Sequence, residues 1–244
     1  MRKLKYALLM VIPLVFLLLT GCSKLSLSTT KKEYSADGLV AIIKGKATNY
    51  EKLTYTVAGE TKKVAVDDDH FAITVPVSNK DQNVRIKAVD GDKTETSLVK
   101  VKKATPLKSY LEFAQTYNYT MLSMGQADDQ LPLIVKNGIS THKKSDDTKW
   151  YINVQNNQLM GIATDFSYKA LKSKTGQKDL ATDLTIISKL LGADGEKVLK
   201  DFAKQTKNAE SNSTKTSMDT IKSNGINYNI NLATKGFYLY ITKY

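Results

Sequence analysis

The sequence predicts two folded parts: an antiparallel β-sandwich, followed by an α+β domain in which helices pack on an antiparallel sheet. Between residues 34 and 103, short alternating apolar segments are separated by turn residues such as Asp90-Gly91-Asp92. Several short strands at this regular spacing are typical of a sandwich. After Pro106 the apolar residues recur every three or four positions, which indicates a helix. Helical and alternating stretches then follow one another twice, which favours an α+β domain.

Residues 1–21 have the order of charges and apolar residues that is typical of a secretory signal peptide. A basic start is followed by an apolar run, by small residues and by the only cysteine of the chain; the residues concerned are Arg2, Lys3, Lys5, Tyr6 to Leu19, Thr20, Gly21 and Cys22. The run is short for a membrane-spanning helix, which needs about 20 apolar residues, and it contains Pro13. An uncleaved membrane helix, cleavage without lipid and a buried thiol are the alternatives.

The stretch Leu19-Thr20-Gly21-Cys22 resembles the lipobox of bacterial lipoproteins. The resemblance implies that cleavage falls between Gly21 and Cys22 and that the Cys22 thiol carries a diacylglyceryl group. Two acyl chains give stable anchoring, so we expect the protein at the outer face of a cell membrane. The abundance of lysine, asparagine and threonine favours a Gram-positive host. Beyond the lipid we expect no cofactor and no metal ion.

Residues 22–33 are polar and without a period, and they predict a lipidated tether. In the sandwich that follows, Phe71, Ile73 and Val75 alternate on one face of a strand, and a second strand over 83–89 alternates in the same way. Residues 34–103 resemble the bacterial Ig-like modules of surface proteins, in the acidic turn before Phe71-Ala72-Ile73-Thr74-Val75-Pro76 and in the strand Asn83 to Asp90. The resemblance implies a spacer or adhesion module and transfers no catalytic residue.

The α+β domain is predicted over residues 107–244. A helix runs from Leu107 to Met124, with Thr105 as its N-cap and Gly125 as its stop. A hairpin turns at Asn156-Asn157, two residues that tolerate positive φ. Further helices are expected from about Asp179 to Gly192 and after Asp194, and a last hairpin covers 226–241. We expect the two hairpins to join into one antiparallel sheet with the helices on its apolar face.

The formal charge of +12 comes almost entirely from lysine, spread over both halves of the chain. Arginine is the side chain favoured for bidentate recognition of phosphates and bases, and only Arg85 follows the signal peptide. We therefore expect no nucleic-acid partner. Attraction to anionic lipid headgroups or to an anionic cell-wall polymer fits better, although scattered lysines also keep proteins soluble.

The sequence offers little for catalysis. The two histidines, His70 and His142, fall in a predicted turn and in a predicted polar loop, and no nucleophile elbow or zinc motif is present. Asp67-Asp68-Asp69 and Asp128-Asp129 lack the converging oxygens of a calcium site and are interpreted as solvated turns. We therefore predict that the protein is not an enzyme. An unrecognised hydrolase that uses a pair of aspartates stays open as an alternative.

Aromatic residues in the last strand provide the candidate binding site. Tyr238 and Tyr240 alternate with Phe237 and Leu239, so the two tyrosines share one face. Tyrosine beside lysine suits contact with a glycan, a wall polymer or a protein; the bland interpretation is that these tyrosines pack against a helix or merely favour a strand. The sequence thus predicts a lipid-anchored, non-catalytic binding or adhesion protein for a protein, peptide or cell-wall polymer. An accessory, immunity or inhibitor lipoprotein acting on a membrane or wall partner is the alternative.

Overall fold

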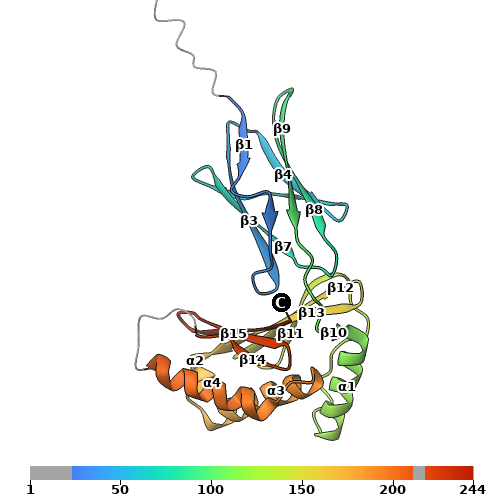
Figure 1. Ribbon diagram of the computed structural model, residues 1–244, viewed down its shortest axis with the longest axis vertical. Helices are drawn as coiled ribbons and strands as arrows, with labels where there is room; N and C mark the ends of the chain where they lie inside the picture. Colours follow the sequence, from blue (N-terminus) through green and yellow to red (C-terminus); the bar gives the residue numbers. More distant parts are fainter. Residues whose placement is uncertain (1–23, 211–217, 244) are drawn as a thin grey trace, which may run out of the picture.

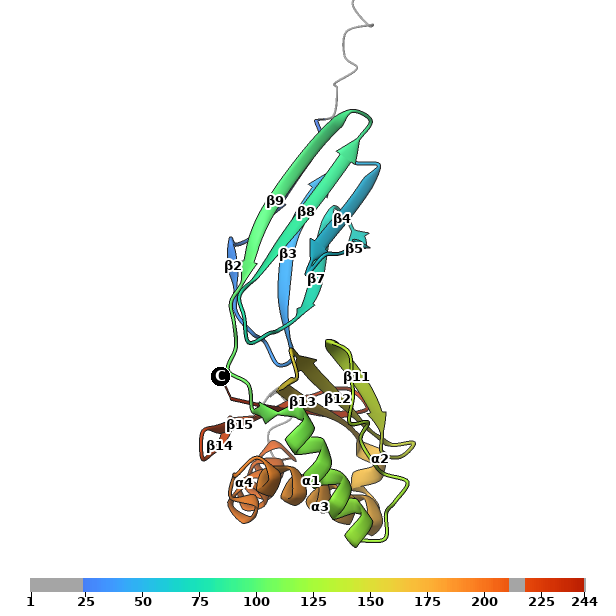
Figure 2. The same cartoon turned by 90° about the vertical axis from the view of Figure 1, so that its right-hand side faces the viewer.

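The computed structural model describes residues 24–210 and 218–243 of the chain. It consists of two parts stacked along the long axis, a β-sandwich and an α+β domain (Figure 1). The described chain begins at the end of the sandwich that lies farthest from the α+β domain (Figures 1 and 2). The predicted signal peptide, its cleavage site and Cys22 lie outside the described residues.

The sandwich consists of two sheets, with strand orders β1-β3-β7-β6 and β2-β9-β8-β4-β5. Neighbouring strands are antiparallel, except that β2 runs parallel to β9. The strands are β1 (Ser26–Thr29), β2 (Glu33–Tyr34), β3 (Val40–Thr48), β4 (Lys52–Val57), β5 (Glu60–Lys63), β6 (Val66–Asp67), β7 (His70–Pro76), β8 (Gln82–Asp90) and β9 (Lys93–Val101).

The inward faces of the two sheets form one hydrophobic core. The predicted alternation is confirmed on both central strands, since Phe71, Ile73 and Val75 of β7 are buried and Val84, Ile86 and Ala88 of β8 are fully buried. Alternate burial of this kind places polar residues outward at every second position.

The prediction of a tether over 22–33 is wrong for its described part. Residues Ser26 to Thr29 form β1, which pairs antiparallel with Thr48 to Gly45 of β3. Leu25 is buried in the sandwich core and Leu27 packs against it. Two leucines alternating with hydroxyl residues are enough for a short edge strand, and the polar composition concealed this period in the sequence.

The α+β domain is built on one antiparallel sheet of order β11-β12-β13-β16-β15-β14, with β10 paired to β13. This confirms that the two predicted hairpins join, through β13 and β16. The elements are β10 (Lys108–Ser109), α1 (Tyr110–Ser123), β11 (Gly138–Lys143), β12 (Thr148–Gln155), β13 (Gln158–Ser167), α2 (Tyr168–Leu171), α3 (Lys174–Leu190), α4 (Gly195–Glu210), β14 (Ile221–Ser223), β15 (Ile226–Leu232) and β16 (Gly236–Thr242).

The helices cover the face of this sheet that points away from the sandwich (Figure 1). Helix α1 begins later than predicted, because Ser109 and not Thr105 is its N-cap: the Ser109 hydroxyl accepts from the backbone N–H of Glu112. Helix α3, in contrast, begins at Lys174, earlier than the predicted Asp179, because Ser173 is its N-cap. The turn at Asn156-Asn157 has the expected positive φ at both residues, and Asp194 accepts from the N–H of Lys197 at the start of α4.

A β-bulge between β12 and β13 lies at the contact between the sandwich and the α+β domain. The pairing of β12 with β13 shifts between Asn153 and Val154, so Met160 is an extra residue and turns into the sandwich core, whereas Ile162, two positions later, faces the helices. Beside it, the fully buried Asn153 amide donates from Nδ2 to the carbonyl oxygens of Leu39 at 3.0 Å and Val77 at 2.9 Å. The sandwich therefore docks on the face of the sheet opposite the helices.

Within the described residues, none of the helices combines the length and the apolar character needed to cross a membrane.

Candidate functional site

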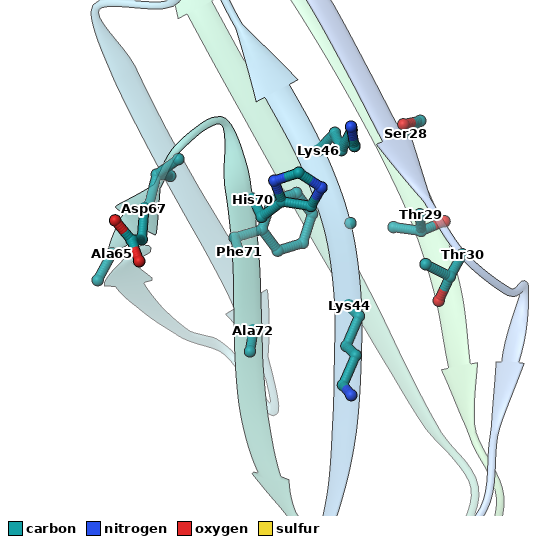
Figure 3. Close-up of a pocket in the computed structure, with 12 residues that line it drawn as sticks. Ser28, Thr29, Thr30, Lys44, Lys46, Ala65, Asp67, His70, Phe71 and Ala72 are labelled. Atoms are coloured by element: carbon teal, nitrogen blue, oxygen red, sulfur yellow. The ribbon is translucent and has the colours of Figure 1, made fainter.

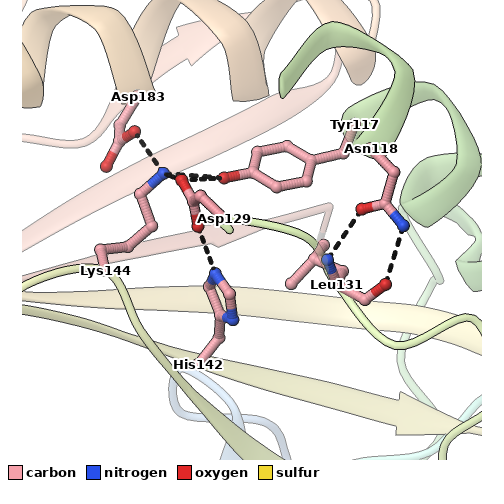
Figure 4. Close-up of polar contacts among 7 residues, drawn as sticks. All are labelled: Tyr117, Asn118, Asp129, Leu131, His142, Lys144 and Asp183. Carbon is pink, nitrogen blue, oxygen red and sulfur yellow. Dashed lines mark hydrogen bonds and ion pairs between the residues drawn. The ribbon is translucent and has the colours of Figure 1, made fainter. Parts of the chain in front are cut away.

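A buried cluster of charged side chains lies between the helices and the first strands of the α+β domain (Figure 4). Lys144, just after β11, is at its centre, and only 11% of its side chain is exposed. Its ammonium group contacts a carboxylate oxygen of Asp129 and lies 3.2 Å from Oδ1 of Asp183. It also donates to the hydroxyl of Tyr117 at 2.7 Å. One lysine thus joins the segment after α1, helix α1 itself and helix α3.

Asp129 receives hydrogen bonds on both carboxylate oxygens. His142 Nε2 lies 2.6 Å from Oδ1, and the Tyr117 hydroxyl donates to Oδ2 at 2.9 Å. Burial alone would raise the pKa of Asp129, but the hydrogen bonds from His142 and Lys144 outweigh it and lower the pKa to about 2. Asp129 is therefore ionised at neutral pH.

Asp183 is the second carboxylate that contacts Lys144, and its pKa is shifted in the opposite direction. Its side chain is 12% exposed, and burial raises its pKa to about 6 although Lys144 opposes the shift. The two aspartates thus have pKa values pushed apart by their surroundings, a pattern common at functional sites.

Two aromatic rings enclose the lysine ammonium group. The Lys144 Nζ atom lies 4.8 Å from the centre of the Trp150 ring and 5.4 Å from the centre of the Tyr117 ring. Trp150 and Tyr117 meet edge to face at 5.3 Å. The cation is thus held by ring faces as well as by carboxylates, and the rings exclude water from one side of it.

Local structure explains why these residues converge. His142 lies opposite Trp150 in the pairing of β11 with β12, so His142 and Lys144, two residues apart, turn to the same helix-covered side. Asp183 lies within the buried stripe of α3, next to Leu184 and one turn after Leu180. The segment that carries Asp129 is held along α1 by the Asn118 side chain, which bonds both the N–H and the carbonyl of Leu131.

Sequence reasoning missed this cluster. Strand β11 was not predicted, so the assignment of His142 to a polar loop is wrong. Asp128 and Asp129 lie in a turn as predicted, but Asp129 is half-buried and paired instead of solvated. One signal was available: a carboxylate at position 183 interrupts the apolar stripe of a predicted helix. Such a residue needs a buried partner.

A cavity of about 320 Å³ borders the cluster on its solvent side. Its lining includes Asp128, Asp129, Asp179 and Asp183 together with Lys144. In the described part of the chain, no group of three or more histidine, aspartate or glutamate side chains is arranged to hold a metal ion; the expectation of no metal and no cofactor stays a prediction.

The predicted tyrosine stripe lies elsewhere, on the sheet face opposite the helices. Tyr238 and Tyr240 stack with ring centres 6.3 Å apart. Tyr238 lies between Asp165 and Asn231 on the neighbouring strands, and Tyr240 between Ala163 and Asn229. Tyr151 faces Ala163 one strand further. Together, Tyr151, Asp165, Asn229, Asn231, Tyr238 and Tyr240 are called the tyrosine–asparagine face below.

Tyr240 also touches the sandwich. A Cβ atom placed on Gly38 would lie 2.6 Å from Cδ1 of Tyr240, so the glycine backbone packs directly on the ring. Burial, followed by the charges of neighbouring groups, raises the pKa of the Tyr240 hydroxyl. The two tyrosines therefore differ: Tyr240 is part of the contact between the two parts, and Tyr238 lies one row farther out.

A groove of about 730 Å³ lies on the sandwich (Figure 3). Lys44, Lys46 and His70 line it from β3 and β7, and all three are exposed. His70 was predicted as a turn residue, but it is the first residue of β7; it is exposed, and its ring bonds the carbonyl of Asp68 in the preceding turn at 2.6 Å. The charged groups that the fold buries and connects lie instead around Lys144.

None of the protein families compared with the chain matches it, and no curated protein matches it either. Three solved structures share small parts of the architecture. The endo-β-1,4-mannanase from Thermotoga petrophila is 11% identical with a TM-score of 0.30 over 34% of this chain and 20% of that one. The β-glucuronidase 3 of Bacteroides uniformis is 12% identical with a TM-score of 0.28 over 56% of this chain and 16% of that one.

The third is a protein from Bacteroides thetaiotaomicron, solved by NMR, which is 14% identical with a TM-score of 0.23 over 34% of this chain and 86% of that one. The chain thus spans about a fifth or less of the length of the two glycosidases. At these scores the likenesses assign the chain neither a family nor an activity.

Proposed function

We propose that this protein is a lipid-anchored lipoprotein on the outer face of the cell membrane, that the sandwich is a spacer, and that the α+β domain binds a cell-wall polymer without catalysis. The observation that carries the binding proposal is the tyrosine–asparagine face. Tyrosine rings offer flat apolar surfaces with a polar tip, and amide and carboxylate groups in adjacent rows offer hydrogen bonds. This combination suits a hydroxyl-rich polymer.

The arrangement of the face supports the proposal. Across three neighbouring strands, Asp165, Tyr238 and Asn231 form one row, and Ala163, Tyr240 and Asn229 form the next. Asn231 is exposed and Tyr238 is half-buried. A row of side chains across antiparallel strands has a fixed spacing of about 5 Å, which gives an extended ligand regular contact points.

The position of the chain start supports the spacer role. Residue 24, two positions after the predicted lipid attachment at Cys22, lies at the sandwich end remote from the α+β domain (Figures 1 and 2). A lipid at Cys22 would therefore hold the α+β domain a full sandwich length away from the membrane.

Co-sedimentation with insoluble cell-wall material from a Gram-positive bacterium, prepared with its attached anionic polymer, tests the binding proposal. We expect the full chain to pellet with the wall and Tyr238→Ala to lose most of this binding, since truncating an aromatic anchor of a binding surface costs about 2 kcal/mol or more. The matched control is Tyr119→Ala, because Tyr119 is 74% exposed on α1, away from the face. Equal sedimentation of the wild type and Tyr238→Ala would contradict the proposed site.

A second surface favours the alternative of an accessory or inhibitor lipoprotein. Leu111 and Leu122 of α1 are 45% and 54% exposed, and they lie three helical turns apart on one stripe. Asn118, on the same stripe, holds Leu131, so the segment with the exposed Leu133 and Ile134 runs beside it. Apolar strips of this kind are typical of protein contacts. Loss of a protein partner, with wall binding intact, in Leu122→Asp would favour this alternative.

A further inference from the structure

We propose that Lys144 and Asp129 condense into an intramolecular amide bond, with Asp183 as the proton relay, so that the α+β domain carries a covalent cross-link. The geometry meets the first requirement of such a bond. The Lys144 Nζ atom is in direct contact with Oδ2 of Asp129, so the attacking nitrogen and the carboxyl carbon are neighbours (Figure 4). Holding reactants together in this way removes much of the entropic barrier to a bimolecular reaction.

The chemistry balances without any other reactant. A lysine ammonium and an aspartate carboxylate contain all the atoms of one amide and one water. Two protons leave Nζ, its lone pair forms the N–C bond with Cγ of Asp129, and the bond from Cγ to Oδ2 breaks. Both protons end on the departing oxygen, which leaves as water. No net charge is gained or lost in the cluster.

Asp183 is placed to move these protons. Its Oδ1 lies 3.2 Å from Lys144 Nζ, on α3, while the acceptor Asp129 comes from a different segment. A pKa of about 6, raised by burial, lets this carboxyl take and return a proton near neutral pH. Asp183 touches the reacting nitrogen and so acts as a general acid–base group.

The contacts of Asp129 distinguish its two oxygens. Oδ1 is bonded to His142 Nε2 at 2.6 Å and would remain as the carbonyl oxygen of the amide. Oδ2 faces Lys144 and receives the Tyr117 hydroxyl at 2.9 Å, so a donor is already at the leaving oxygen. A proton on His142 Nε2 would stabilise the negative charge that develops on Oδ1 during attack.

The surroundings favour the amide over the separated charges. Lys144 and Asp183 are 11% and 12% exposed, and the rings of Trp150 and Tyr117 cover the ammonium group. Burying a charged pair costs free energy that a neutral amide does not. The product would close a loop from residue 129 to residue 144 and fasten the segment after α1 to the end of β11.

Peptide mass spectrometry of the full chain after unfolding and trypsin digestion tests the proposal. The expected product is the peptide 109–136 joined to the peptide 144–149, lighter than the two together by one water (about 18 Da). Trypsin does not cut after an amidated lysine, so Lys144 stays uncut in that product. The linkage is expected to be absent from Lys144→Arg, which keeps the charge but forms no amide.

Two further variants test the role of Asp183 separately from that of the reacting groups, Lys144 and Asp129. Asp183→Asn keeps both reacting groups, and we expect at least a tenfold loss of cross-linked product after the same incubation at neutral pH. Asp128→Asn changes an exposed neighbour of Asp129 and should leave the linkage complete. The cross-link would be overturned if wild-type protein, incubated to completion, gave the free peptide 109–136 and trypsin cut after Lys144. The two residues would then form an ion pair only. Full linkage in Asp183→Asn would overturn the role of Asp183.

Discussion

The two parts of this molecule differ in how far their ion pairs are exposed to solvent. In the sandwich, ion pairs such as Lys100 with Asp81 and Lys102 with Glu33 lie on the surface, with side chains 42% to 52% exposed. In the α+β domain, Lys144 is 11% exposed and contacts two carboxylates, the buried Asp183 and the half-buried Asp129. Exposed pairs contribute little to folding, whereas a buried pair is costly to form and costly to break. The difference distinguishes a sandwich whose ion pairs are solvated from a domain that buries a cluster of charged groups.

The largest expected effect comes from removing the central cation. Lys144→Met leaves the buried Asp183 without its cation and leaves the half-buried Asp129 with only His142 and Tyr117, and we expect a loss of about 3 to 5 kcal/mol in the free energy of unfolding of the α+β domain. The sole tryptophan, Trp150, lies in the cluster and reports this transition by its fluorescence. The matched control Lys102→Met, in the sandwich, should change stability by less than about 1 kcal/mol. Similar losses in both variants would remove the contrast between the two parts.

The pH dependence of stability is the next largest effect. Because the folded pKa of Asp183 is raised from 3.8 to about 6, the folded state holds this proton more tightly than the unfolded chain. The associated stability is present below pH 4 and is lost as the pH rises through 6, by on the order of 3 kcal/mol. Urea unfolding followed by Trp150 fluorescence should show this fall, and Asp183→Asn should remove it.

Asp129 contributes with the opposite sign. In chains whose Lys144–Asp129 linkage has not formed, the folded pKa of Asp129 is lowered from 3.8 to about 2, so its stabilisation is present above pH 4 and is lost only as the pH falls through 2. The difference in stability between the wild type and Asp183→Asn across pH 4 to 6 therefore isolates Asp183, because acids such as Glu33, whose pKa is lowered, contribute equally to both. A difference that does not change with pH in that window would contradict the raised pKa of Asp183.

A smaller effect on stability tests the packing of the sandwich at Gly45. It also tests the position of β1, which lies where a tether was predicted. A Cβ atom on Gly45 would lie 2.2 Å from the carbonyl oxygen of Ser28 in β1 and 2.3 Å from Cζ of Phe71. Gly45→Ala is expected to destabilise the sandwich by about 1 to 3 kcal/mol through overpacking. Gly91→Asn is the control, since Gly91 has open space around it and a positive φ that asparagine tolerates. Equal stability of the two variants by thermal unfolding would contradict the close packing of Gly45 against β1 and Phe71.

The smallest effect concerns the contact between the parts. Asn153→Ala removes two hydrogen bonds to the carbonyls of Leu39 and Val77, a loss of about 1 to 2 kcal/mol at the domain contact. Small-angle scattering should then show a broader distribution of molecular dimensions, because the docked arrangement competes with bent ones. An unchanged scattering profile would mean that the packing of Met160 and Tyr240 suffices.

Much of this fold could be predicted from local sequence patterns. Alternation in β7 and β8 gave the correct inward residues, and Asn156-Asn157 marked a true hairpin turn. The errors occurred where tertiary contacts outweigh local signals: β1 forms because Leu25 and Leu27 find the sandwich core. Met160 faces the sandwich because a β-bulge, which no sequence pattern indicates, shifts the alternation of β13 by one residue.

The candidate sites differ in the same way. Tyr238 and Tyr240 come from one strand, so their common face could be predicted by counting residues, and the structure places them together. The Lys144 cluster draws on α1, the segment after it, β11 and α3. No local pattern links Asp129 to Asp183, since their proximity depends on the packing of the whole domain.

The proposed division into a membrane-proximal spacer and a distal binding domain depends on the proposed lipid at Cys22. Mass spectrometry of the protein extracted from membranes measures this directly. Our account predicts a mature chain that begins at Cys22 with a diacylglyceryl group on its sulfur. A chain that still begins at Met1, or an unmodified Cys22, would contradict it.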